Sequence, residues 1–334
     1  MSTSLVSTFI GALDIGGTKI AVTIADANGP LAKLTQATVK VGTPDALGQQ
    51  VVTLLKAGCE KAGIDPMALE AVGVSSCGPF VCVEDKINLC APNICGGLAT
   101  RGDLPNDWTI LPLQVPLEQH FKKVVIRNDC IAALHGERLF GTAIDEANVV
   151  YVTWSTGIGF GLCVDGHLLM GKQGNAGHAG HLLMEPDGKT RCGCGNLGDL
   201  ESLISGMNIS RGQALDTPAL FAAARAGDQA AKASVTAAAQ WLGKALYNLV
   251  VTLDTKLFLI GGSVWQHHGD WLAPIVIQEI ASRFPALTKG VVITKPGLGA
   301  LVADIGALSL VMPEQWIPVW QTSQAWQRSS YLPN

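Results

Sequence analysis

The sequence predicts an α/β protein made of two similar lobes. Its 334 residues are 48% hydrophobic and only 15% charged, so the chain can bury a large core, and this length favours two domains over one. A strand, a glycine turn and a second strand are predicted near the N-terminus, and the same order is predicted again from residue 148. Helical and strand patterns alternate between and after these segments, which is typical of an α/β fold.

The first glycine turn lies in the apolar run at residues 9–24, FIGALDIGGTKIAVTI. The adjacent Gly16 and Gly17 let backbone N–H groups come close to a phosphate. Thr18 can donate its hydroxyl, and Asp14 can orient a hydrated magnesium ion. The segment is not a Walker loop, because no G-K-[ST] opens a helix. Taken alone, these residues fit a plain hairpin better than a phosphate site.

The second glycine turn, Ser155-Thr156-Gly157, follows the apolar run NVVYVTW and precedes the run IGFGLCV. Thr18 precedes Gly29 by eleven positions, and Thr156 precedes Gly166 by ten. This weak repeat indicates two similar lobes, each of which presents a glycine hairpin to one nucleotide. The alternative is a chance pair of hairpins.

The remaining elements follow from apolar spacing and from the positions of Pro and Gly. Helices are predicted at 43–62, 130–140, 218–226, 229–253 and 299–311, strands at 71–75, 124–126, 256–260 and 291–294, a hairpin turn at 28–29 and a loop at 91–97. Asp129 ends a strand and opens a helix, so it is either a helix N-cap or a ligand-binding group at the strand ends. Gly261-Gly262 exposes backbone N–H groups at a helix start, which suits a nucleotide.

The glycine-rich segment at residues 174–206 combines several metal-binding side chains. Four of them can close a tetrahedral zinc site, namely His181, Cys192, Cys194 and Asp199. A metal there would tie down a loop that has no core of its own. The alternative is two core cysteines, a surface aspartate and a solvated histidine. A carboxylate is a harder ligand than a thiolate, so Asp199 weakens the case for tightly bound zinc.

Charge and cysteine usage narrow the class of protein. The net charge is -4 and the pI is near 6.0, and without a lysine or arginine cluster nothing favours nucleic acid as a partner. No uncharged apolar run reaches 18 residues, and the N-terminus lacks the basic region of a signal peptide, so we expect no membrane association. Nine scattered cysteines are not a disulfide framework. We expect a reducing, cytoplasmic location, with most of the cysteines as small buried residues.

Four motifs between residues 13 and 311 resemble, in the same order, the ROK family of sugar kinases and sugar-responsive repressors. Asp14 begins the family's first phosphate motif, D-x-G-G-T-K, and Asn128-Asp129 matches its catalytic Asn-Asp pair. The segment that ends at Glu201 resembles the family's zinc loop, roughly E-x-G-H and then C-x-C-G-x-x-G-C-x-E. Two positions depart from this pattern: His178 stands where most members have Glu, and Asp199 stands where a cysteine ligand is expected.

The resemblance implies a two-lobed actin-like ATPase fold, of the ribonuclease H-like type, with a cleft between the lobes. The first lobe would take residues 1–128, with a C-terminal helix at about 299–320 packed back on it. The larger second lobe would take residues 129–298, including the zinc loop. A homodimer or homotetramer is expected. The tail, with Trp316, Trp320 and Trp326, is expected to pack on the protein or to make an oligomer contact.

The resemblance also implies a role for each candidate residue in transfer of the γ-phosphate of ATP to the 6-hydroxyl of a hexose. Asp129 would accept the proton of the attacking hydroxyl, in a transfer that depends mainly on positioning and charge neutralisation. Sugar contacts are expected from Asn93, Asn128, His178, His181 and Glu201. ATP with Mg2+ is expected at Asp14, Gly16, Gly17, Thr18, Lys19, Ser155, Thr156, Gly157, Gly261 and Gly262. A structural zinc is expected at His181, Cys192, Cys194 and Asp199.

Two of these assignments have alternatives or double roles. Asn93 lies in the predicted loop at 91–97, where an asparagine that stabilises a turn is an equally good interpretation. His181 is assigned to both the metal and the sugar, which is compatible because an imidazole can bind a metal through one ring nitrogen and donate from the other.

The residue at position 178 bears on which sugar binds. A neutral histidine has one acceptor and one donor, so it cannot reproduce the two-hydroxyl grip of the usual glutamate. Some relatives similar to bacterial N-acylmannosamine kinases carry His at this place. We therefore expect a sugar that differs from glucose near carbon 1 or 2, such as mannose or a 2-acylamino sugar. An N-acetylmannosamine kinase is one alternative within this class.

A sugar-sensing regulator is the alternative from another class. Repressors of the family carry a helix-turn-helix domain ahead of the first phosphate motif and commonly lose that motif. Here 13 residues precede Asp14 and D-x-G-G-T-K is kept, so the sequence favours a kinase.

Overall fold

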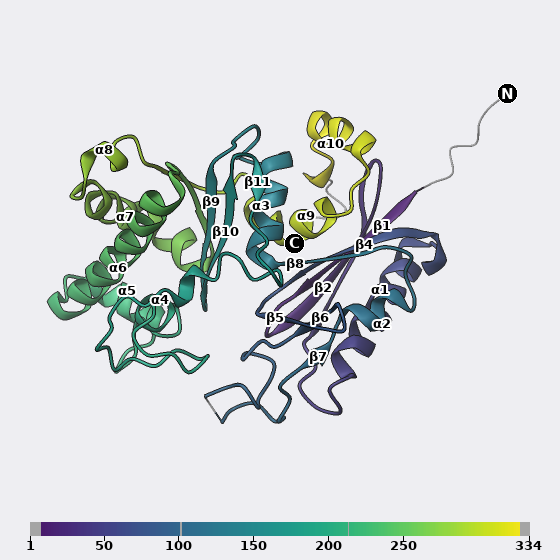
Figure 1. Ribbon diagram of the computed structural model, residues 1–334, viewed down its shortest axis with the longest axis horizontal. Helices are drawn as coiled ribbons and strands as arrows, with labels where there is room; N and C mark the ends of the chain where they lie inside the picture. The colour runs from purple at the N-terminus through teal and green to yellow at the C-terminus, as the bar shows by residue number, and fades with distance from the viewer. Residues whose placement is uncertain (1–7, 101, 213, 328–334) are drawn as a thin grey trace. The chain divides into compact units, whose positions relative to one another are not determined.

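The computed structural model describes residues 8–100, 102–212 and 214–327 (Figure 1). Within these residues the chain divides into two compact units. Unit 1 takes the chain up to Ile144, the segment 170–175 and the chain from Gly297 onward, and unit 2 takes residues 145–169 and 176–296. The expected boundary at residues 128/129 assigns the following helix to the second lobe. In the structure that helix belongs to unit 1.

Unit 1 contains two sheets and the helices that cover them. Its strands are β1 (Phe9–Ile15), β2 (Lys19–Asp26), β3 (Gly29–Ala37), β4 (Leu69–Ser76), β5 (Phe80–Val83), β6 (Lys86–Leu89), β7 (Leu111–Pro112) and β8 (Val124–Asn128). Its helices are α1 (Ala46–Ala62), α2 (Gln114–Glu118), α3 (Asp129–Phe140), α9 (Val302–Ser309) and α10 (Ile317–Ser323), with short 3-10 turns η1 (Pro66–Ala68), η3 (Gly299–Leu301), η4 (Glu314–Trp316) and η5 (Ala325–Gln327).

The larger sheet of unit 1 has the order β3-β2-β1-β4-β8, and a small sheet has the order β5-β6-β7. In the larger sheet β1, β4 and β8 run parallel, while β2 and β3 run antiparallel to their neighbours. Side chains of β1 alternate between two cores: Leu13 and Ile15 pack on the α1 face, and Ile10 and Ala12 pack on the α9 face. This period of two buries both faces of the sheet, and Figure 1 shows helices on each side of it.

The C-terminal tail packs on unit 1. Trp316, Trp320 and Trp326 are all buried, and the rings of Trp320 and Trp326 lie 6.0 and 5.3 Å from that of Phe140 on α3. Of the two interpretations that the sequence left open for these tryptophans, the structure supports packing on the protein itself.

Glu137 fixes the two chain segments next to the unit boundaries. Its carboxylate is fully buried and accepts backbone N–H groups of Thr142, Gly297 and Leu298, each at 2.8 Å. Hydrogen bonds to an ionised buried acceptor are among the stronger ones in proteins. This side chain therefore ties the segment that leaves unit 1 to the segment that returns to it.

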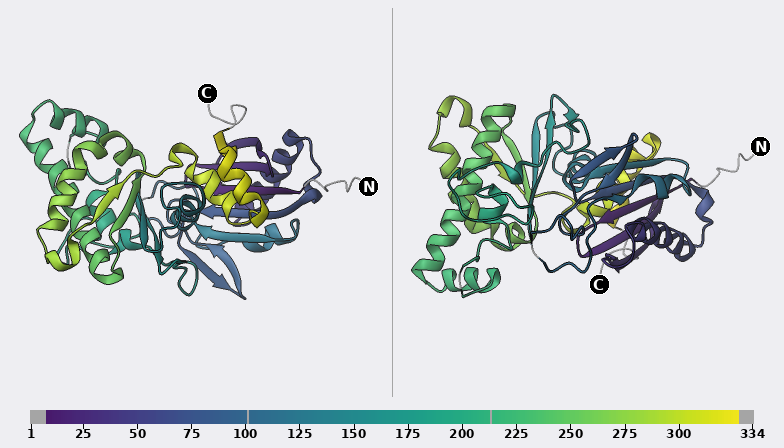
Figure 2. Two further views of the ribbon diagram at one scale, coloured as in Figure 1. Left: turned by 90° about the horizontal axis from the view of Figure 1, so that it is seen from above. Right: turned by 60° about the horizontal axis from the view of Figure 1, so that its bottom comes forward.

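Unit 2 contains its own sheet and its own helices. Its strands are β9 (Val149–Trp154), β10 (Ile158–Val164), β11 (His167–Leu168), β12 (Leu257–Gly261) and β13 (Val292–Thr294), in the order β11-β10-β9-β12-β13. Its helices are α4 (Leu200–Ile204), α5 (Thr217–Arg225), α6 (Gln229–Leu253), α7 (Ser263–Ala281) and α8 (Pro285–Thr288), with the 3-10 turn η2 (Ala179–His181). These helices form a layer beside the sheet (Figure 2) and share one hydrophobic core with it.

The structure also bears on the glycine hairpins, the cysteines and the possibility of a membrane-spanning helix. Both predicted strand–turn–strand segments are present, as β1–β2–β3 and β9–β10–β11. All nine cysteines are free thiols, and five of them are buried. Among the described residues, no helix is both long enough and apolar enough to cross a membrane.

Candidate active site and metal centre

The carboxyl ends of three neighbouring parallel strands in unit 1 carry polar side chains. Asp14 on β1 is in register with Ser75 on β4, and Ser76 is in register with Asn128, the last residue of β8. The Ser75 hydroxyl donates to Asp14 Oδ1 at 3.1 Å. Ligands of open α/β sheets bind at this edge, so the strand order itself assembles a candidate site.

Asp14 lies in an environment that disfavours its charge. Burial raises its pKa to about 6, and the negative charges of Asp129 and Asp304 act in the same direction. The hydrogen bond from Ser75 and the charge of Lys33 oppose this shift but are weaker. A carboxyl group whose pKa is raised by the charge of a second carboxylate suits a divalent cation, which would neutralise that charge. The Asp14 and Asp129 pair therefore fits a magnesium ion.

Asn128, and not Asp129, is the N-cap of α3. The side-chain oxygen of Asn128 accepts the backbone N–H of Cys130 at 3.0 Å. Asp129 is the first residue of the helix, and its Oδ1 accepts the same N–H at 2.8 Å. The N-cap alternative for Asp129 was therefore wrong by one residue, because asparagine caps a helix as well as aspartate does.

The first glycine turn is held by backbone bonds and by the end of β3. Gly16 N–H donates to the Lys19 carbonyl at 3.0 Å, and Thr38 N–H donates to the Thr18 carbonyl at 3.0 Å. The hydroxyl of Thr38 donates to the Gly16 carbonyl at 2.7 Å. Thr18 and Lys19 are exposed, so the tip of the turn is accessible to a ligand while its ends are fixed.

Asn93 packs directly on this turn. A Cβ atom added at Gly17 would lie 2.6 Å from Asn93 Nδ2 and 2.8 Å from Cγ, so only glycine leaves room for the carboxamide. The Cys77 thiol donates to Asn93 Oδ1 at 3.7 Å. Burial raises the pKa of Cys77 to about 12, with help from the charge of Asp129, so this thiol remains protonated and can donate. The carboxamide thus faces the glycine turn and Cys77.

Ser75 and Cys77 were not predicted as residues of the site. Neither belongs to a continuous motif, since Ser75 enters the site through its register with β1 and Cys77 follows the end of β4. A search for polar residues at the carboxyl ends of adjacent parallel strands would have found both.

In unit 2 the second glycine turn meets the Gly-Gly turn. Ser155 N–H donates to the Gly157 carbonyl at 2.9 Å, and the hydroxyls of Ser155 and Ser263 lie 2.9 Å apart. Gly262 has a φ of 86°, and a Cβ atom there would lie 2.4 Å from the Trp154 carbonyl oxygen. Glycine is therefore required at this position. Ser263, the first residue of α7, was not predicted as part of the site.

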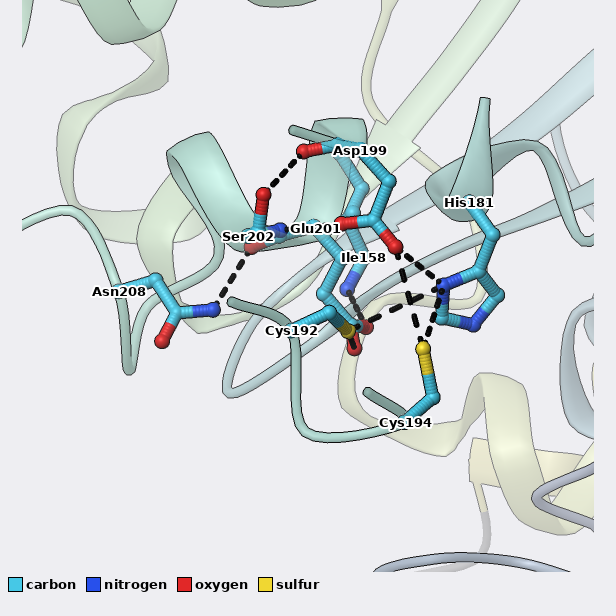
Figure 3. Close-up of polar contacts among 8 residues, drawn as sticks. All are labelled: Ile158, His181, Cys192, Cys194, Asp199, Glu201, Ser202 and Asn208. Atoms are coloured by element: carbon cyan, nitrogen blue, oxygen red, sulfur yellow. Dashed lines mark hydrogen bonds and ion pairs between the residues drawn. The ribbon is translucent and has the colours of Figure 1, made fainter. Parts of the chain in front are cut away.

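The four expected zinc ligands cluster in unit 2 (Figure 3). Their ligand atoms all lie within 4.8 Å of one another. His181 Nδ1 lies 2.9 Å from Asp199 Oδ2, 3.6 Å from Cys194 Sγ and 3.9 Å from Cys192 Sγ. Ligand atoms around a tetrahedral zinc are separated by about 3.2–3.8 Å, given bond lengths of about 2.0–2.3 Å. The donor set and its spacing therefore fit a zinc ion.

Asp199 uses its two carboxylate oxygens differently. Oδ1 accepts the backbone N–H of Ser202 at 2.8 Å and so caps α4, while Oδ2 faces His181 and Cys194. Burial opposes ionisation, but the hydrogen bonds from His181 and Ser202 lower the pKa of Asp199 below its ordinary value. In the same way the hydrogen bond to Asp199 raises the pKa of His181 to about 10. One side chain thus links the metal cluster to the helix that carries Glu201.

Glu201 connects the metal cluster to the second glycine turn. Its Oε1 accepts the Cys192 thiol at 3.1 Å, and its Oε2 accepts the backbone N–H of Ile158 at 3.1 Å. A Cβ atom at Gly157 would lie 2.7 Å from Oε2. The rings of His178 and His181 stack with centroids 6.3 Å apart. The structure therefore brings Gly157, Glu201 and both histidines into one region of unit 2.

A known protein family matches most of the chain. Residues 10–314 match the model of the ROK family. The chain belongs to the ROK family.

Relatives of this ROK protein include named sugar kinases. It is 30% identical over 308 residues to a glucokinase of Pyrobaculum calidifontis, covering 89% of this chain and 93% of the relative. It is 31% identical over 290 residues to an N-acetylmannosamine kinase of Salmonella newport, covering 83% and 91%.

Solved structures of the family share the fold of this ROK protein. The ROK hexokinase of Thermus thermophilus aligns with a TM-score of 0.74 at 29% identity, covering 90% of this chain and 97% of that one. A ROK family glucokinase of Streptomyces griseus in complex with glucose and AMPPNP aligns with a TM-score of 0.65 at 27% identity, covering 90% and 98%. The fold is thus the α/β actin-like ATPase fold.

Proposed function

We propose that this protein is an ATP-dependent sugar kinase that transfers the γ-phosphate to the 6-hydroxyl of a hexose of the glucose or mannose type or of a 2-amino or 2-acylamino hexose. The observation that carries the proposal lies at the carboxyl ends of the strands of unit 1. Asn93 packs on the glycine turn that follows Asp14, and Asp129 opens the helix after β8, from where its charge helps to raise the pKa of Asp14. The kinases among the relatives, and the glucose and AMPPNP complex of a structural neighbour, support the same reaction class.

Asp129 is proposed as the general base. It would accept the hydrogen bond of the 6-hydroxyl, orient an oxygen lone pair toward the γ-phosphorus, and receive the proton as the bond to phosphorus forms. The helix start fixes its position, because Asn128 caps α3. Asn93 and Asn128 are proposed to hold neighbouring sugar hydroxyls.

Asp14 is proposed to orient the magnesium ion through its water ligands. A bound Mg2+ neutralises charge on the phosphates during transfer. The turn at Gly16, Gly17, Thr18 and Lys19, of which the last two residues are exposed, would donate hydrogen bonds to phosphate oxygens.

The turns of unit 2 are proposed as a second set of nucleotide-binding groups. Ser155, Thr156 and Gly157 would contact phosphates, and Gly261-Gly262 would lie beside the adenosine. The hydrogen-bond distance between the hydroxyls of Ser155 and Ser263 supports this assignment, because it holds the two turns together.

The metal cluster is proposed to be a structural zinc site formed by His181, Cys192, Cys194 and Asp199. The distances among the four ligand atoms support it. Zinc supplies a fixed crosslink in a loop with little core of its own. The crosslink would hold His181, through its second ring nitrogen, and Glu201 in place for the sugar.

His178 favours a sugar that is modified at carbon 2 or differs from glucose there. An imidazole cannot accept from two adjacent hydroxyls as a carboxylate does, but it can pair with one hydroxyl or with an acyl oxygen. Mannose and 2-acylamino hexoses, N-acetylmannosamine among them, are the proposed substrates.

A coupled assay that follows ADP formation tests the proposal. Glucose, mannose, glucosamine, N-acetylglucosamine and N-acetylmannosamine are compared with ATP as donor, and ADP and polyphosphate are tested with the best sugar by detecting the phosphorylated sugar directly. We expect ATP-dependent turnover, with kcat/KM higher for a sugar that differs from glucose at carbon 2. Absence of turnover with every sugar and donor contradicts the kinase, and a strong preference for glucose contradicts the role of His178.

A substitution tests the role of His178 separately. His178→Glu supplies the carboxylate that most ROK kinases carry, so we expect kcat/KM for glucose to rise relative to the 2-modified sugars. The ratio of the two kcat/KM values is the measurement, since a general loss of activity leaves that ratio unchanged. An unchanged ratio contradicts the assignment of His178 to the sugar.

A further inference from the structure

The segment 170–175 is attached to the small sheet of unit 1 through side chains. Asn175 makes two hydrogen bonds with one residue: its Oδ1 accepts Phe80 N–H at 2.8 Å, and its Nδ2 donates to the Phe80 carbonyl at 2.8 Å. Gln173 Oε1 accepts Cys82 N–H at 3.0 Å. Both contacts lie on β5, an edge strand in the order β5-β6-β7.

The spacing of these contacts matches the spacing of a strand edge. Backbone groups two residues apart on an edge strand point the same way, and Phe80 and Cys82 are two apart, as are Asn175 and Gln173. A carboxamide carries one acceptor and one donor group side by side, as a peptide does. Asn175 therefore takes the place of a paired residue and covers the edge of β5.

The attachment point follows Cys77 closely in the chain. Phe80, the first residue of β5, is three residues beyond Cys77, whose thiol donates to Asn93 Oδ1. Asn175 is thus fixed to a strand that begins three residues after the neighbour of Asn93.

The residues after Asn175 carry the proposed sugar specificity. His178 is three residues further on, so their Cα atoms can be at most about 11 Å apart whatever the path of the loop. On its other side the loop packs closely on β10. A Cβ atom at Gly177 would lie 2.4 Å from the Phe160 carbonyl oxygen, and one at Gly180 would lie 2.2 Å from that of Ile158.

We propose that Asn175 is a positioning residue, which fixes the start of the His178 loop to β5 and thereby restricts the positions open to the sugar-recognising histidine. The proposal rests on the proposed kinase function. Loss of the two hydrogen bonds frees the start of the loop, so His178 is held less firmly and the sugar is bound less tightly and in more orientations. The nucleotide turns keep all their contacts.

The test compares Asn175→Ala and Asn175→Asp with a matched control. Asn175→Asp keeps the acceptor for Phe80 N–H but places a carboxylate oxygen against the Phe80 carbonyl. The control is Gln114→Ala, which removes a carboxamide that accepts Ile87 N–H at 2.9 Å on β6 of the same small sheet. Sugar and ATP KM, kcat, the melting temperature, and the sugar Kd by calorimetry are measured for each protein.

For both Asn175 variants we expect the sugar KM and Kd to rise at least tenfold and kcat to fall, while the ATP KM changes less than twofold. Gln114→Ala should leave the sugar KM and Kd within threefold of the unaltered protein. A melting temperature that falls equally in Asn175→Ala and Gln114→Ala, with the sugar Kd unchanged in both, overturns the proposal and leaves Asn175 a purely structural residue. Equal increases in the sugar and ATP KM overturn it as well.

The same measurements separate this proposal from the proposed function. If the unaltered protein phosphorylates no sugar, the kinase assignment is wrong. The calorimetric sugar Kd then decides alone: a tenfold weaker Kd in Asn175→Ala supports the positioning role, and an unchanged Kd, or no sugar binding by the unaltered protein, overturns it.

Discussion

Replacement of Asp199 separates metal binding from helix capping. Asp199 Oδ1 caps α4 through the N–H of Ser202, and Oδ2 lies 2.9 Å from His181 Nδ1 in the ligand cluster. Asparagine caps a helix as well as aspartate does but offers the metal a neutral amide. Asp199→Asn therefore keeps the cap and removes the anionic ligand, whereas Asp199→Cys restores a thiolate ligand and removes the carboxylate cap.

The expected magnitudes follow from these contacts. Loss of a side chain that merely orients a metal ligand typically weakens metal binding about 10–100-fold, so loss of the ligand itself should weaken zinc binding at least about 100-fold. At a zinc concentration about 100 times the Kd of the unaltered protein, the metal adds about 2.7 kcal/mol to stability. That corresponds to an increase in Tm of roughly 5–10 °C. Loss of the cap costs about 1 kcal/mol with or without zinc.

The assay is thermal unfolding of chelator-treated protein, titrated with zinc chloride, together with metal analysis. The zinc-dependent increase in Tm is the quantity compared, because Asp199→Asn also loses the ion pair with His181 in the metal-free protein. We expect this increase to be largely lost in Asp199→Asn and retained in Asp199→Cys. One equivalent of zinc bound by Asp199→Asn with unchanged affinity would refute Asp199 as a ligand.

Three further substitutions test other parts of the structure. Gly17→Ala should displace the whole Asn93 side chain, since Nδ2 and Cγ are both within 2.8 Å of the new Cβ. We expect the sugar KM to rise about tenfold, and an unchanged sugar KM contradicts a contact between Asn93 and the sugar. The pKa of Asp14 is raised to about 6 from 3.8, so ionisation of this side chain lowers the stability of the folded protein as the pH rises through 6. Asp14→Asn should therefore be more stable than the unaltered protein at pH 8, by up to about 3 kcal/mol, and equally stable below about pH 4. Without variants, kcat/KM should fall as the pH drops below about 6, because Asp14 must be ionised to orient the metal; a flat profile from pH 7 to 5 contradicts this. Glu137→Gln places an amide N–H group against backbone N–H donors, so the free energy of unfolding, measured by chemical denaturation, should fall by about 2–4 kcal/mol. A decrease below about 0.5 kcal/mol would argue against the three hydrogen bonds.

Local sequence signals predicted the long elements well. The helix at Gln229–Leu253 was predicted to the residue from its alanine and leucine content. In the structure Asp228 caps its start and Asp254 ends it in the left-handed conformation. The strand at 124–126 was predicted too short. Arg127 and Asn128 are polar, and they extend β8 only because they pair with Ser75 and Ser76 of β4. The strands β5 to β7 were not predicted, since strands of two to four residues depend on their partners for stability.

The site residues divide in the same way, between those that local sequence signals indicate and those that strand pairing brings into the site. Residues inside continuous motifs, such as Asp14, Asp129 and the four metal-binding side chains, could be selected as candidates from the sequence, and the resemblance to the ROK family supplied the roles predicted for them. Ser75, Cys77 and Asn175 act through residues that strand register or edge pairing brings to them. No spacing within the sequence encodes those contacts. Ser75 and Cys77 could have been found only by comparing the carboxyl ends of the predicted parallel strands, and Asn175 only from the fold.

The most direct test of the kinase mechanism is Asp129→Asn. Asparagine keeps a side-chain oxygen that can accept the Cys130 N–H, as Asp129 Oδ1 does at 2.8 Å, but it cannot accept a proton. With the best sugar of the panel, kcat should fall at least about 100-fold while the calorimetric sugar Kd stays within about threefold. A variant that retains a kcat close to that of the unaltered protein would contradict the assignment of Asp129 as the base.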